Sequence, residues 1–205
     1  MTPGKPTPKT VAIVDGGGAN IASLQFALAR LGVTGELTVD PAVIRSASHV
    51  ILPGVGAARP AMDRLRQRGV ADLIPLLTQP VLGVCLGLQL LFEKSEEDDT
   101  ECLGILGGSV RRFTPAPGRP VPHMGWNQVM PVRNSPLLAD VPGNSYFYFV
   151  HSYAAETGPT TTGRTDYGWS FSAVVEAGNF LATQFHPERS GPMGARVLSN
   201  FLNRY

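Results

Sequence analysis

Short apolar segments alternate with amphipathic ones through the first half of the chain, and this alternation allows few folds. The β-branched, apolar run Thr10–Val14 leads into the Asp-Gly-Gly-Gly stretch 15–18, a pattern typical of a buried strand followed by a flexible turn. Asn20 can then cap a helix. The apolar positions of that helix recur at intervals of three and four residues, the spacing of one buried face: Ile21, Leu24, Leu28 and Leu31.

The same alternation continues beyond this helix. Further strands are predicted at 33–39, 50–52 and 81–84. Helices are predicted at Ala61–Arg68, with a basic face, and at Gly87–Glu93. Fully apolar strands that alternate with helices indicate a parallel sheet covered on both faces. We therefore expect a doubly wound, flavodoxin-like α/β domain.

The second half of the chain has a different pattern. Short β-type runs, separated by turns rich in Pro and Gly, occur at Ser109–Phe113, Gln128–Val132, Tyr146–Val150, Ser172–Glu176 and Phe180–Gln184. We interpret them as mixed or antiparallel strands that extend the same sheet. A closing helix is predicted to begin near Pro192 and to run to Asn203. No linker divides the chain, so we expect one domain at 10–205, preceded by a disordered tail at 1–9.

Composition and charge exclude several classes of protein. The 205 residues are 43% apolar and 16% charged, which favours a sizeable core over disorder. A net charge of +1 gives no overall field for nucleic acid or an acidic membrane. The longest uncharged apolar run, Val81–Phe92, has 12 residues, whereas a membrane span needs about 20. The first ten residues lack the apolar core of a secretory signal, and the two cysteines form neither a disulfide framework nor a metal-binding pair. We expect a cytoplasmic protein.

Cys85 is the strongest candidate for chemistry. It stands in GVCLG (83–87), the G-x-nucleophile-x-G form of a nucleophile elbow, between an apolar strand and a helix. Such a turn exposes Sγ above the carboxyl ends of the strands, and the helix N-terminus favours the thiolate. The backbone N–H of Leu86 would face a tetrahedral oxyanion. The alternative is a buried structural cysteine. Cys102, which follows an acidic loop and has no elbow, is interpreted in that way.

A cysteine nucleophile needs a base, and His186 is the best placed of the four histidines. It follows an apolar strand that breaks at Pro187, so its imidazole is expected at a strand's carboxyl end, where doubly wound sheets bind their ligands. Glu188 could bond the far ring nitrogen and stabilise the imidazolium. A His-Pro turn with a solvated glutamate is the alternative. The position of Cys85 at a neighbouring strand end favours the catalytic interpretation.

These residues belong to two segments, GVCLGLQLLFE (83–93) and QFHPE (184–188), that resemble the signatures of the class I, triad-type glutamine amidotransferases. Members of that class hydrolyse the side-chain amide of glutamine and pass the ammonia on. Three further motifs are more selective: LPGVGA (52–57), PHMGWN (122–127) and YFVHSY (148–153). Taken in order along nearly the whole chain, the motifs resemble the glutaminase subunits of imidazole glycerol phosphate synthase, an enzyme of histidine biosynthesis.

The resemblance implies a role for each motif. The implied catalytic triad is Cys85, His186 and Glu188, and the implied oxyanion hole comprises Leu86, Gly54 and Val55. The implied glutamine-binding residues are Gln89, Glu97, His151, Ser152 and Tyr153. The implied partner surface includes Asn20, Trp126 and Arg189. The implied partner is a (β/α)8-barrel cyclase subunit, which uses the ammonia to make imidazole glycerol phosphate and an aminoimidazole carboxamide ribotide. No metal or organic cofactor is implied.

The residue types suit these roles. The α-ammonium group of glutamine requires a carboxylate, which Glu97 can supply, and its α-carboxylate requires donors, which segment 151–153 can supply. Without the resemblance, Glu97 would be interpreted as one solvated charge in an acidic run.

The sequence also departs from the family's pattern. Gly16 and Ala19 replace a tyrosine and a glycine in the first turn, Ala58-Arg59 stands where a phenylalanine is common, and Arg189 replaces a lysine. Two other functions remain open. One is a different enzyme of the class, either a glutaminase for another synthase or a cysteine peptidase, and the selective motifs argue against it. The other is a binding module that has lost its chemistry, and the intact candidate triad argues against that.

Overall fold

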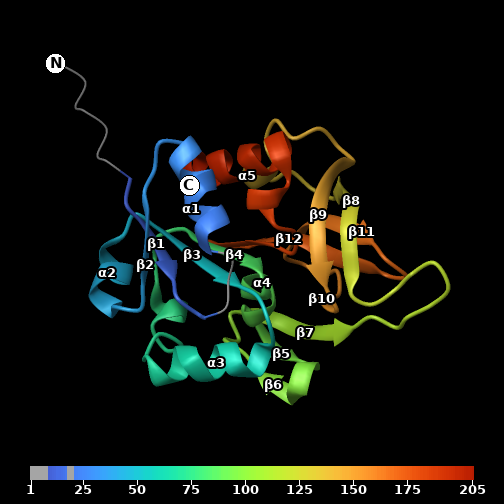
Figure 1. Cartoon of the computed structure of the whole chain (residues 1–205), viewed down its shortest axis with the longest axis horizontal. Coiled ribbons are helices and arrows are strands. Elements are labelled where there is room, and N and C mark those ends of the chain that lie inside the picture. Colours follow the sequence, from blue (N-terminus) through green and yellow to red (C-terminus); the bar gives the residue numbers. More distant parts are fainter. Residues whose placement is uncertain (1–8, 18–20) are drawn as a thin grey trace.

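A nine-stranded sheet forms the centre of the computed structural model, which describes residues 9–17 and 21–205 (Figure 1). Its order is β2-β1-β3-β4-β13-β12-β11-β8-β9, and the first five strands in this order are parallel. They are β2 (Gly35–Thr38), β1 (Val11–Val14), β3 (His49–Gly54), β4 (Val81–Cys85) and β13 (Phe180–Thr183). The order 2-1-3-4 is that of flavodoxin-like doubly wound sheets, so the predicted fold class is confirmed.

The remaining four strands of this sheet are antiparallel. They are β12 (Ser170–Ala177), β11 (Thr161–Asp166), β8 (His123–Pro131) and β9 (Ser145–His151). The two parts meet at β13, which is parallel to β4 and antiparallel to β12. Apolar patterning predicts β8, β9, β12 and β13, but it does not predict β11, whose sequence, TTGRTD, is mostly polar.

A second, four-stranded sheet has the order β10-β7-β5-β6. Its strands are β5 (Phe92–Ser95), β6 (Thr100–Glu101), β7 (Leu106–Arg112) and β10 (Tyr153–Ala155). Two predictions are wrong in this region. The run 109–113 contributes to β7 and not to the main sheet, and the helix predicted at 87–93 ends at Leu90, because Phe92 pairs with Leu106 in the second sheet. Every residue from 86 to 92 is buried, so no exposed face in the sequence marks where the helix ends.

A single residue, Ser152, joins the two sheets. β9 ends at His151 and β10 begins at Tyr153. Just beyond the junction, Ala154 is buried in the core on one side of the main sheet and Ala155 in the core on the other. This connection brings residues 151–153 to the same cavity as the end of β4.

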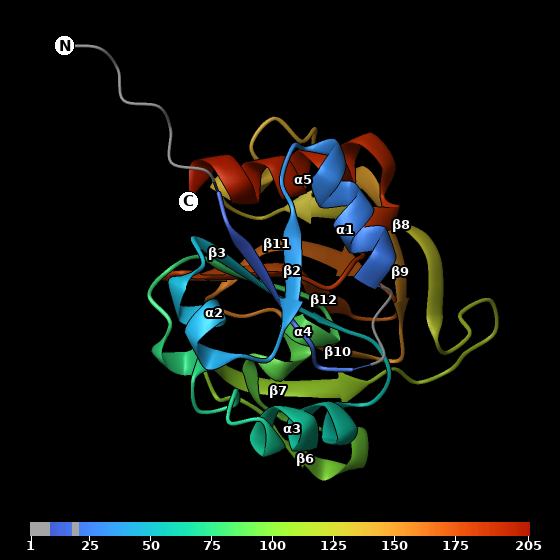
Figure 2. The same ribbon diagram turned by 60° about the vertical axis from the view of Figure 1, so that its left-hand side comes forward.

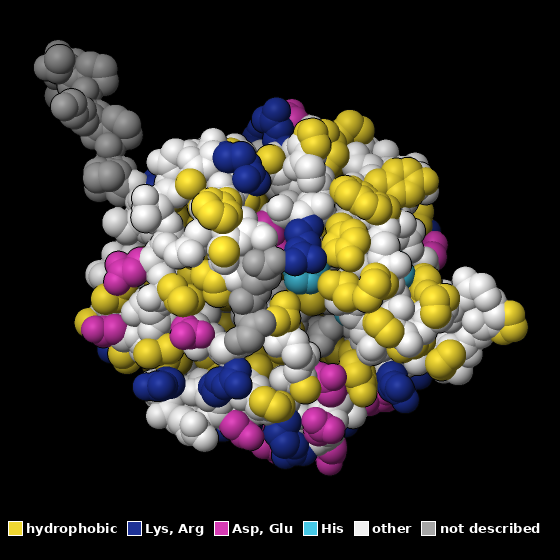
Figure 3. Space-filling view, in the orientation of Figure 1, with side chains coloured by type: hydrophobic (Ala, Val, Ile, Leu, Met, Phe, Trp, Pro, Cys, Tyr) yellow, Lys and Arg dark blue, Asp and Glu magenta, His cyan; other side chains and the backbone are white. Residues whose placement is uncertain are grey.

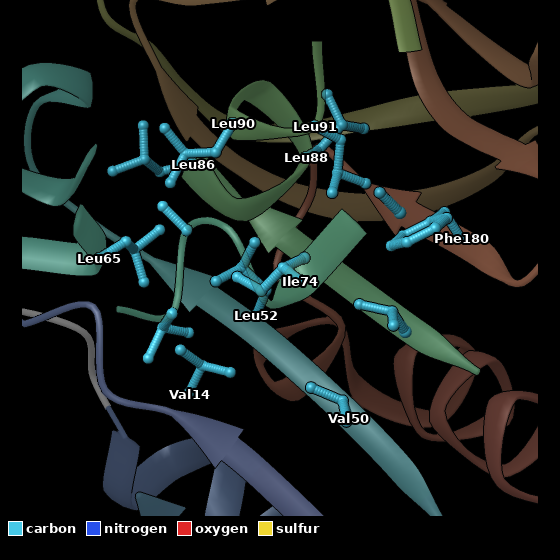
Figure 4. Close-up of a cluster of buried hydrophobic side chains, with 14 of the residues drawn as sticks. Val14, Val50, Leu52, Leu65, Ile74, Leu86, Leu88, Leu90, Leu91 and Phe180 are labelled. Carbon is cyan, nitrogen blue, oxygen red and sulfur yellow. The ribbon is translucent and has the colours of Figure 1, made fainter. Parts of the chain in front are cut away.

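Helices cover both faces of the parallel strands, and each face has its own core. One face carries α1 (Ile21–Arg30) and α5 (Gly191–Arg204), and the other carries α2 (Pro41–Ser46), α3 (Ala58–Gln67) and α4 (Leu86–Leu90), as Figure 2 shows. Strand alternation divides the apolar side chains between the faces. Val50 and Leu52 lie in the core under α3 and α4, drawn in Figure 4, whereas Ile51 lies in the core under α1 and α5.

The short elements fit local signals. In the described part of the chain, four 3-10 turns occur, at Ile74–Leu76, Glu97–Asp99, Pro136–Leu138 and Pro187–Arg189. Helix α2, which apolar spacing does not predict, begins where Asp40 accepts a hydrogen bond from the N–H of Ala42 at 2.8 Å. Of the predicted tail, only Lys9 lies within the described residues, and its ammonium group donates hydrogen bonds to the Leu202 carbonyl and the Asn203 side chain. Within residues 9–17 and 21–205, no helix is both long and apolar enough to span a membrane.

Candidate active site

Cys85 lies at the turn between β4 and α4. Its backbone has φ 55° and ψ −109°, a conformation that residues with a side chain rarely adopt and that persists only where the surroundings hold it. Gly87 allows the turn to be this tight, because a Cβ there would lie 1.8 Å from the Leu52 carbonyl oxygen on β3. A Cβ on Gly83 would lie 2.8 Å from the Gly87 carbonyl oxygen. The two glycines therefore let α4 pack directly on the strand backbone, which fixes the position of the sulfur.

His186 follows β13, the strand beside β4, and lines the same cavity as Cys85. Its Nδ1 lies 2.9 Å from Oε1 of Glu188, and the two side chains are only 7% and 5% exposed. The other ring nitrogen, Nε2, is buried and has no hydrogen-bond partner among the described residues. Burial lowers the pKa of His186, but the nearby Cys85 sulfur and Glu188 carboxylate outweigh burial and raise the pKa to about 10. The pair therefore favours an imidazolium at neutral pH.

The cavity, of 260 Å³, lies at the carboxyl ends of the parallel strands. Its lining comprises Val55, Gly56, Cys85, Leu86, Gln89, Glu97, Pro122, Val150, His151, Ser152, Tyr153 and His186. Two implied site residues lie next to this lining: Gly54 pairs with Cys85 across adjacent strands, and Glu188 bonds to His186. A larger hollow, of 880 Å³, lies at the amino ends of β1 and β2, and its described lining contains no cysteine or histidine. The chemistry-bearing groups thus converge on the smaller cavity.

Glu97 belongs to the cavity wall and also caps α3. Its Oε2 accepts a hydrogen bond of 2.7 Å from the N–H of Ala58, the first residue of that helix. Arg59 donates a hydrogen bond to the Asp98 carbonyl and so ties the turn after Glu97 to the same helix. Burial raises the pKa of Glu97, and the Ala58 N–H partly opposes that effect. Its Oε1 makes no hydrogen bond to a described residue, which leaves one oxygen for a cationic ligand.

Sequence reasoning gives no role to His123, which is buried beside the cavity. Its Nδ1 lies 3.0 Å from Nε2 of His151, and its ring stacks on those of Phe149 and Tyr167, with centroids 5.1 and 4.0 Å away. His151 Nδ1 in turn donates to the Tyr153 carbonyl at 2.8 Å. Burial lowers the pKa of His123 to about 4 and that of His151 to about 3, so both rings are neutral at pH 7. With both His151 nitrogens engaged, only its backbone and ring face are left for the implied contact with glutamine.

Strands β8 and β9 present an apolar outer face. Met124, Trp126 and Tyr146 are 63%, 56% and 56% exposed, and the ring of Trp126 lies edge-on to that of Tyr148 at a centroid distance of 6.1 Å. Hydrophobic side chains gather on this side of the molecule in Figure 3. Strand alternation explains why the same motif that buries His123 exposes its neighbours. An exposed apolar group of this kind is typical of an interaction surface.

Two of the remaining implied contacts and departures, Arg189 and Gly16, lie within the described residues. Arg189 is exposed, whereas Asn20 and Ala19 lie outside the described residues. At the departure in the first turn, the Gly16 carbonyl accepts a hydrogen bond of 3.2 Å from Arg64 of α3.

The fold and the cavity together indicate one class of protein. Its members carry a cysteine at a strand-to-helix turn and a histidine–glutamate pair just after the adjacent parallel strand. The family model described as glutamine amidotransferase class-I matches residues 13–205. A solved glutamine amidotransferase has the same fold, with a TM-score of 0.73 and 19% identity over 94% of this chain and 96% of that one. A second solved glutamine amidotransferase, from Thermotoga maritima, has a TM-score of 0.65 and 19% identity, and the match covers 97% of this chain and 83% of that one. The chain belongs to the class-I glutamine amidotransferases.

Relatives by sequence narrow the assignment. The imidazole glycerol phosphate synthase subunit HisH of Xanthomonas axonopodis pv. citri (strain 306) is 54% identical over 94% of this chain and 96% of that protein. The subunit of the same name from Xylella fastidiosa (strain Temecula1) is 52% identical over the same shares. Within the class, the chain therefore belongs to the HisH family, which confirms the resemblance that its motifs indicate.

Proposed function

We propose that this chain is the glutaminase subunit of an imidazole glycerol phosphate synthase. It hydrolyses glutamine to glutamate and ammonia in the cytoplasm, and a (β/α)8-barrel cyclase subunit uses the ammonia in histidine biosynthesis. One observation carries the proposal: in a chain of the HisH family, the elbow cysteine and the buried His186–Glu188 pair line and support a single cavity.

The first half-reaction forms a thioester. With the Cys85 proton held on His186 Nε2, the Cys85 thiolate attacks the carboxamide carbon of glutamine, so that a C–S bond forms and the carbonyl electrons move to oxygen. The N–H of Leu86 and the 54–55 peptide stabilise this oxyanion. When the oxyanion collapses, the C–N bond breaks and His186 donates its proton to the departing nitrogen, which leaves as ammonia.

The second half-reaction regenerates the enzyme. Neutral His186 takes a proton from water as the water attacks the thioester, and collapse of the second oxyanion releases glutamate and the Cys85 thiolate. Glu188 supports His186 in both halves, because a carboxylate 2.9 Å from Nδ1 fixes the tautomer and stabilises the imidazolium. The orientation of the ring therefore stays the same while its charge changes.

Free acceptor atoms in the cavity suit the amino-acid end of glutamine. Glu97 has one carboxylate oxygen that no described residue uses, and the side-chain oxygen of Gln89 is also free of hydrogen bonds to described residues. Both would accept from the α-ammonium group, with Glu97 contributing the charge. Segment 151–153, which lines the same cavity, would supply donors to the α-carboxylate.

The partner is proposed to dock on the outer face of β8 and β9. That face is apolar around Trp126, and Arg189 adds a cation close to the active site. A barrel docked there would sit over the cavity rim and could receive ammonia without releasing it to water. Imidazole glycerol phosphate and the aminoimidazole carboxamide ribotide would then be the partner's products.

The proposal is tested by assaying glutamine hydrolysis and glutamine-dependent synthesis with the purified chain, with and without a barrel cyclase subunit. We expect hydrolysis to rise on addition of the barrel subunit and synthesis to require both chains. Hydrolysis that is indifferent to the barrel would favour a different synthase or a peptidase. Absence of hydrolysis under every condition would favour a binding module.

A further inference from the structure

The amide of Gln184 contacts the Cys85 sulfur, and the mechanism above gives it no role. Gln184 is fully buried directly after β13, two residues before His186. Its Nε2 lies 3.8 Å from Sγ of Cys85. Besides its interaction with His186, which raises the pKa of that ring, the thiol has one other hydrogen-bond contact among the described residues, also 3.8 Å long, to the carbonyl oxygen of Val150. One neighbour of the sulfur is therefore a donor and the other an acceptor.

The orientation of the Gln184 amide follows from its neighbours. The Tyr153 carbonyl can only accept, so Gln89, whose Nε2 lies 2.8 Å away, must donate to it. The second proton on the same nitrogen points to Oε1 of Gln184, at 3.2 Å. Since Oε1 accepts from Gln89, the nitrogen of the Gln184 amide must face the sulfur. Rotating either amide would place two donors or two acceptors together in a buried site.

The Tyr153 carbonyl is itself held in place from the other side. His151 Nδ1 donates to it, which leaves Nε2 of His151 to accept from Nδ1 of His123. The second nitrogen of His123 accepts from the amide of Asn127 at 3.3 Å. A relay of hydrogen bonds therefore runs from the half-buried Asn127 on β8 to the Tyr153 carbonyl, and from there through Gln89 and Gln184 to the sulfur. Because the carbonyl accepts from both sides, it sets the direction of the donors on each side.

We infer that Gln184 is a catalytic residue whose amide N–H donates a hydrogen bond to the Cys85 sulfur and stabilises the thiolate, and that Gln89 positions this amide. The inference rests on the proposed role of Cys85 as nucleophile. The contact acts selectively, because the Val150 carbonyl favours the protonated sulfur whereas an N–H donor favours the charged one. When the thiol proton is on His186 Nε2, the sulfur can no longer donate to the Val150 carbonyl. The neutral Gln184 amide still donates to the sulfur, and it does so without giving up a proton.

The charged and titratable groups around the sulfur are few. His186 shares the cavity with it, and Glu188 lies behind His186. Glu97, His151 and Tyr153 line the same cavity. Because Gln184 is neutral and buried, replacing it by another neutral residue leaves these charges unchanged. A shift in thiol ionisation would therefore report the lost donor.

The test measures the rate at which iodoacetamide alkylates Cys85, as a function of pH, in the full chain carrying Cys102→Ser so that one thiol is present. Gln184→Met preserves length and removes the donor. We expect the midpoint of the pH profile to rise by about one unit and kcat for glutamine to fall about tenfold, with KM little changed. Gln184→Glu, which puts a negative charge beside the sulfur, should raise the midpoint further.

The matched control is Gln79→Met, because the Gln79 amide donates to the Ile44 carbonyl, away from the cavity. Its alkylation profile should equal that of the parent. A folded Gln184→Met protein with an unshifted midpoint would overturn the inference. Should that variant fail to fold, Gln184→Asn retracts the same amide by one methylene, and it must shift the midpoint in the same direction for the inference to stand. A separate result, glutamine hydrolysis surviving in Cys85→Ala, would instead remove the proposed function.

Discussion

Two histidine environments face each other across the cavity, and they differ in charge although both are buried. On the parallel side, His186 is flanked by a sulfur and a carboxylate, and its pKa is raised. On the antiparallel side, His151 and His123 have only neutral hydrogen-bond partners, and burial lowers the pKa of each. Burial alone therefore does not determine the charge of a histidine in this fold. The neighbours that each strand end supplies determine it.

The difference also separates two tasks. The charged site lies where parallel strands end side by side, so a nucleophile and a base from distant parts of the sequence meet. The neutral site lies on β8 and β9, where alternation buries one set of side chains and exposes the next. Under the proposed function, the first region carries the chemistry, and the second positions the substrate and contacts the partner.

Removing the sulfur should have the largest effect. We expect Cys85→Ala and Cys85→Ser to abolish glutamine hydrolysis, because the covalent step has no other nucleophile, while the fold and partner binding persist. Cys102→Ser should be nearly silent, since burial raises the Cys102 pKa to about 11 and keeps that thiol protonated. Steady-state glutaminase assays, with circular dichroism as a check on folding, measure both. Equal losses in the two variants would show that the elbow assignment is wrong.

Replacing the charged histidine should uncouple the two halves of the complex. In His186→Ala, glutamine-dependent synthesis should disappear, whereas free ammonia at high pH should still support the partner's cyclisation, because in the proposed mechanism the triad only produces the ammonia. His123→Ala, at the neutral site, should retain part of the glutamine-dependent rate. Loss of ammonia-dependent synthesis in the assembled His186→Ala complex would assign His186 a role beyond glutamine hydrolysis.

The cavity between the two histidine sites should be incomplete without the partner. Segment 53–56, the end of β3 and the turn after it, borders the cavity, and its two glycines, Gly54 and Gly56 (φ +93°), flank Val55 with a backbone freedom that other residues lack. If docking turns the 54–55 peptide into the oxyanion hole, glutamine turnover should rise about 10²–10³-fold when the ligand-bound barrel subunit is added. Turnover should be compared for the chain alone, with the barrel subunit, and with the barrel subunit plus its nucleotide ligand. Equal rates would mean that the loop is a rigid turn.

The smallest effect is a difference in how stability depends on pH. His123 and His151 have pKa values below 6.5 in the folded chain, so the unfolded chain binds protons first, and stability should fall as the pH drops from about 6.5 towards 4. The raised pKa of His186 acts in the opposite direction, and its contribution should be lost as the pH rises from about 6.5 towards 10. The free energy of unfolding, measured with urea across this pH range, should vary less with pH below about 6.5 in His123→Gln. It should vary less with pH above about 6.5 in His186→Gln. Parallel curves for parent and variants would contradict both assignments.

The sequence predicts the parallel half of the molecule well because its signals are local. Fully apolar strands, the GVCLG turn and the break at Pro187 each mark an element within a few residues. The second sheet is not predictable in this way, because Phe92 belongs to a run that is buried on every side. The cap that Glu97 places on α3 joins residues 39 positions apart. The relay through Gln184 is likewise a product of the folded chain alone.

Because the single residue Ser152 joins β9 to β10, the number of residues in this connection cannot change without disturbing the fold. Ala154 and Ala155 point into different cores, so inserting or deleting one residue at the junction would turn the side chains of β10 to the opposite faces. The same change would move the Tyr153 carbonyl away from Gln89 and His151. Loop grafting or domain insertion can therefore use the exposed turns of the molecule, but this connection can vary only in the identity of its residue.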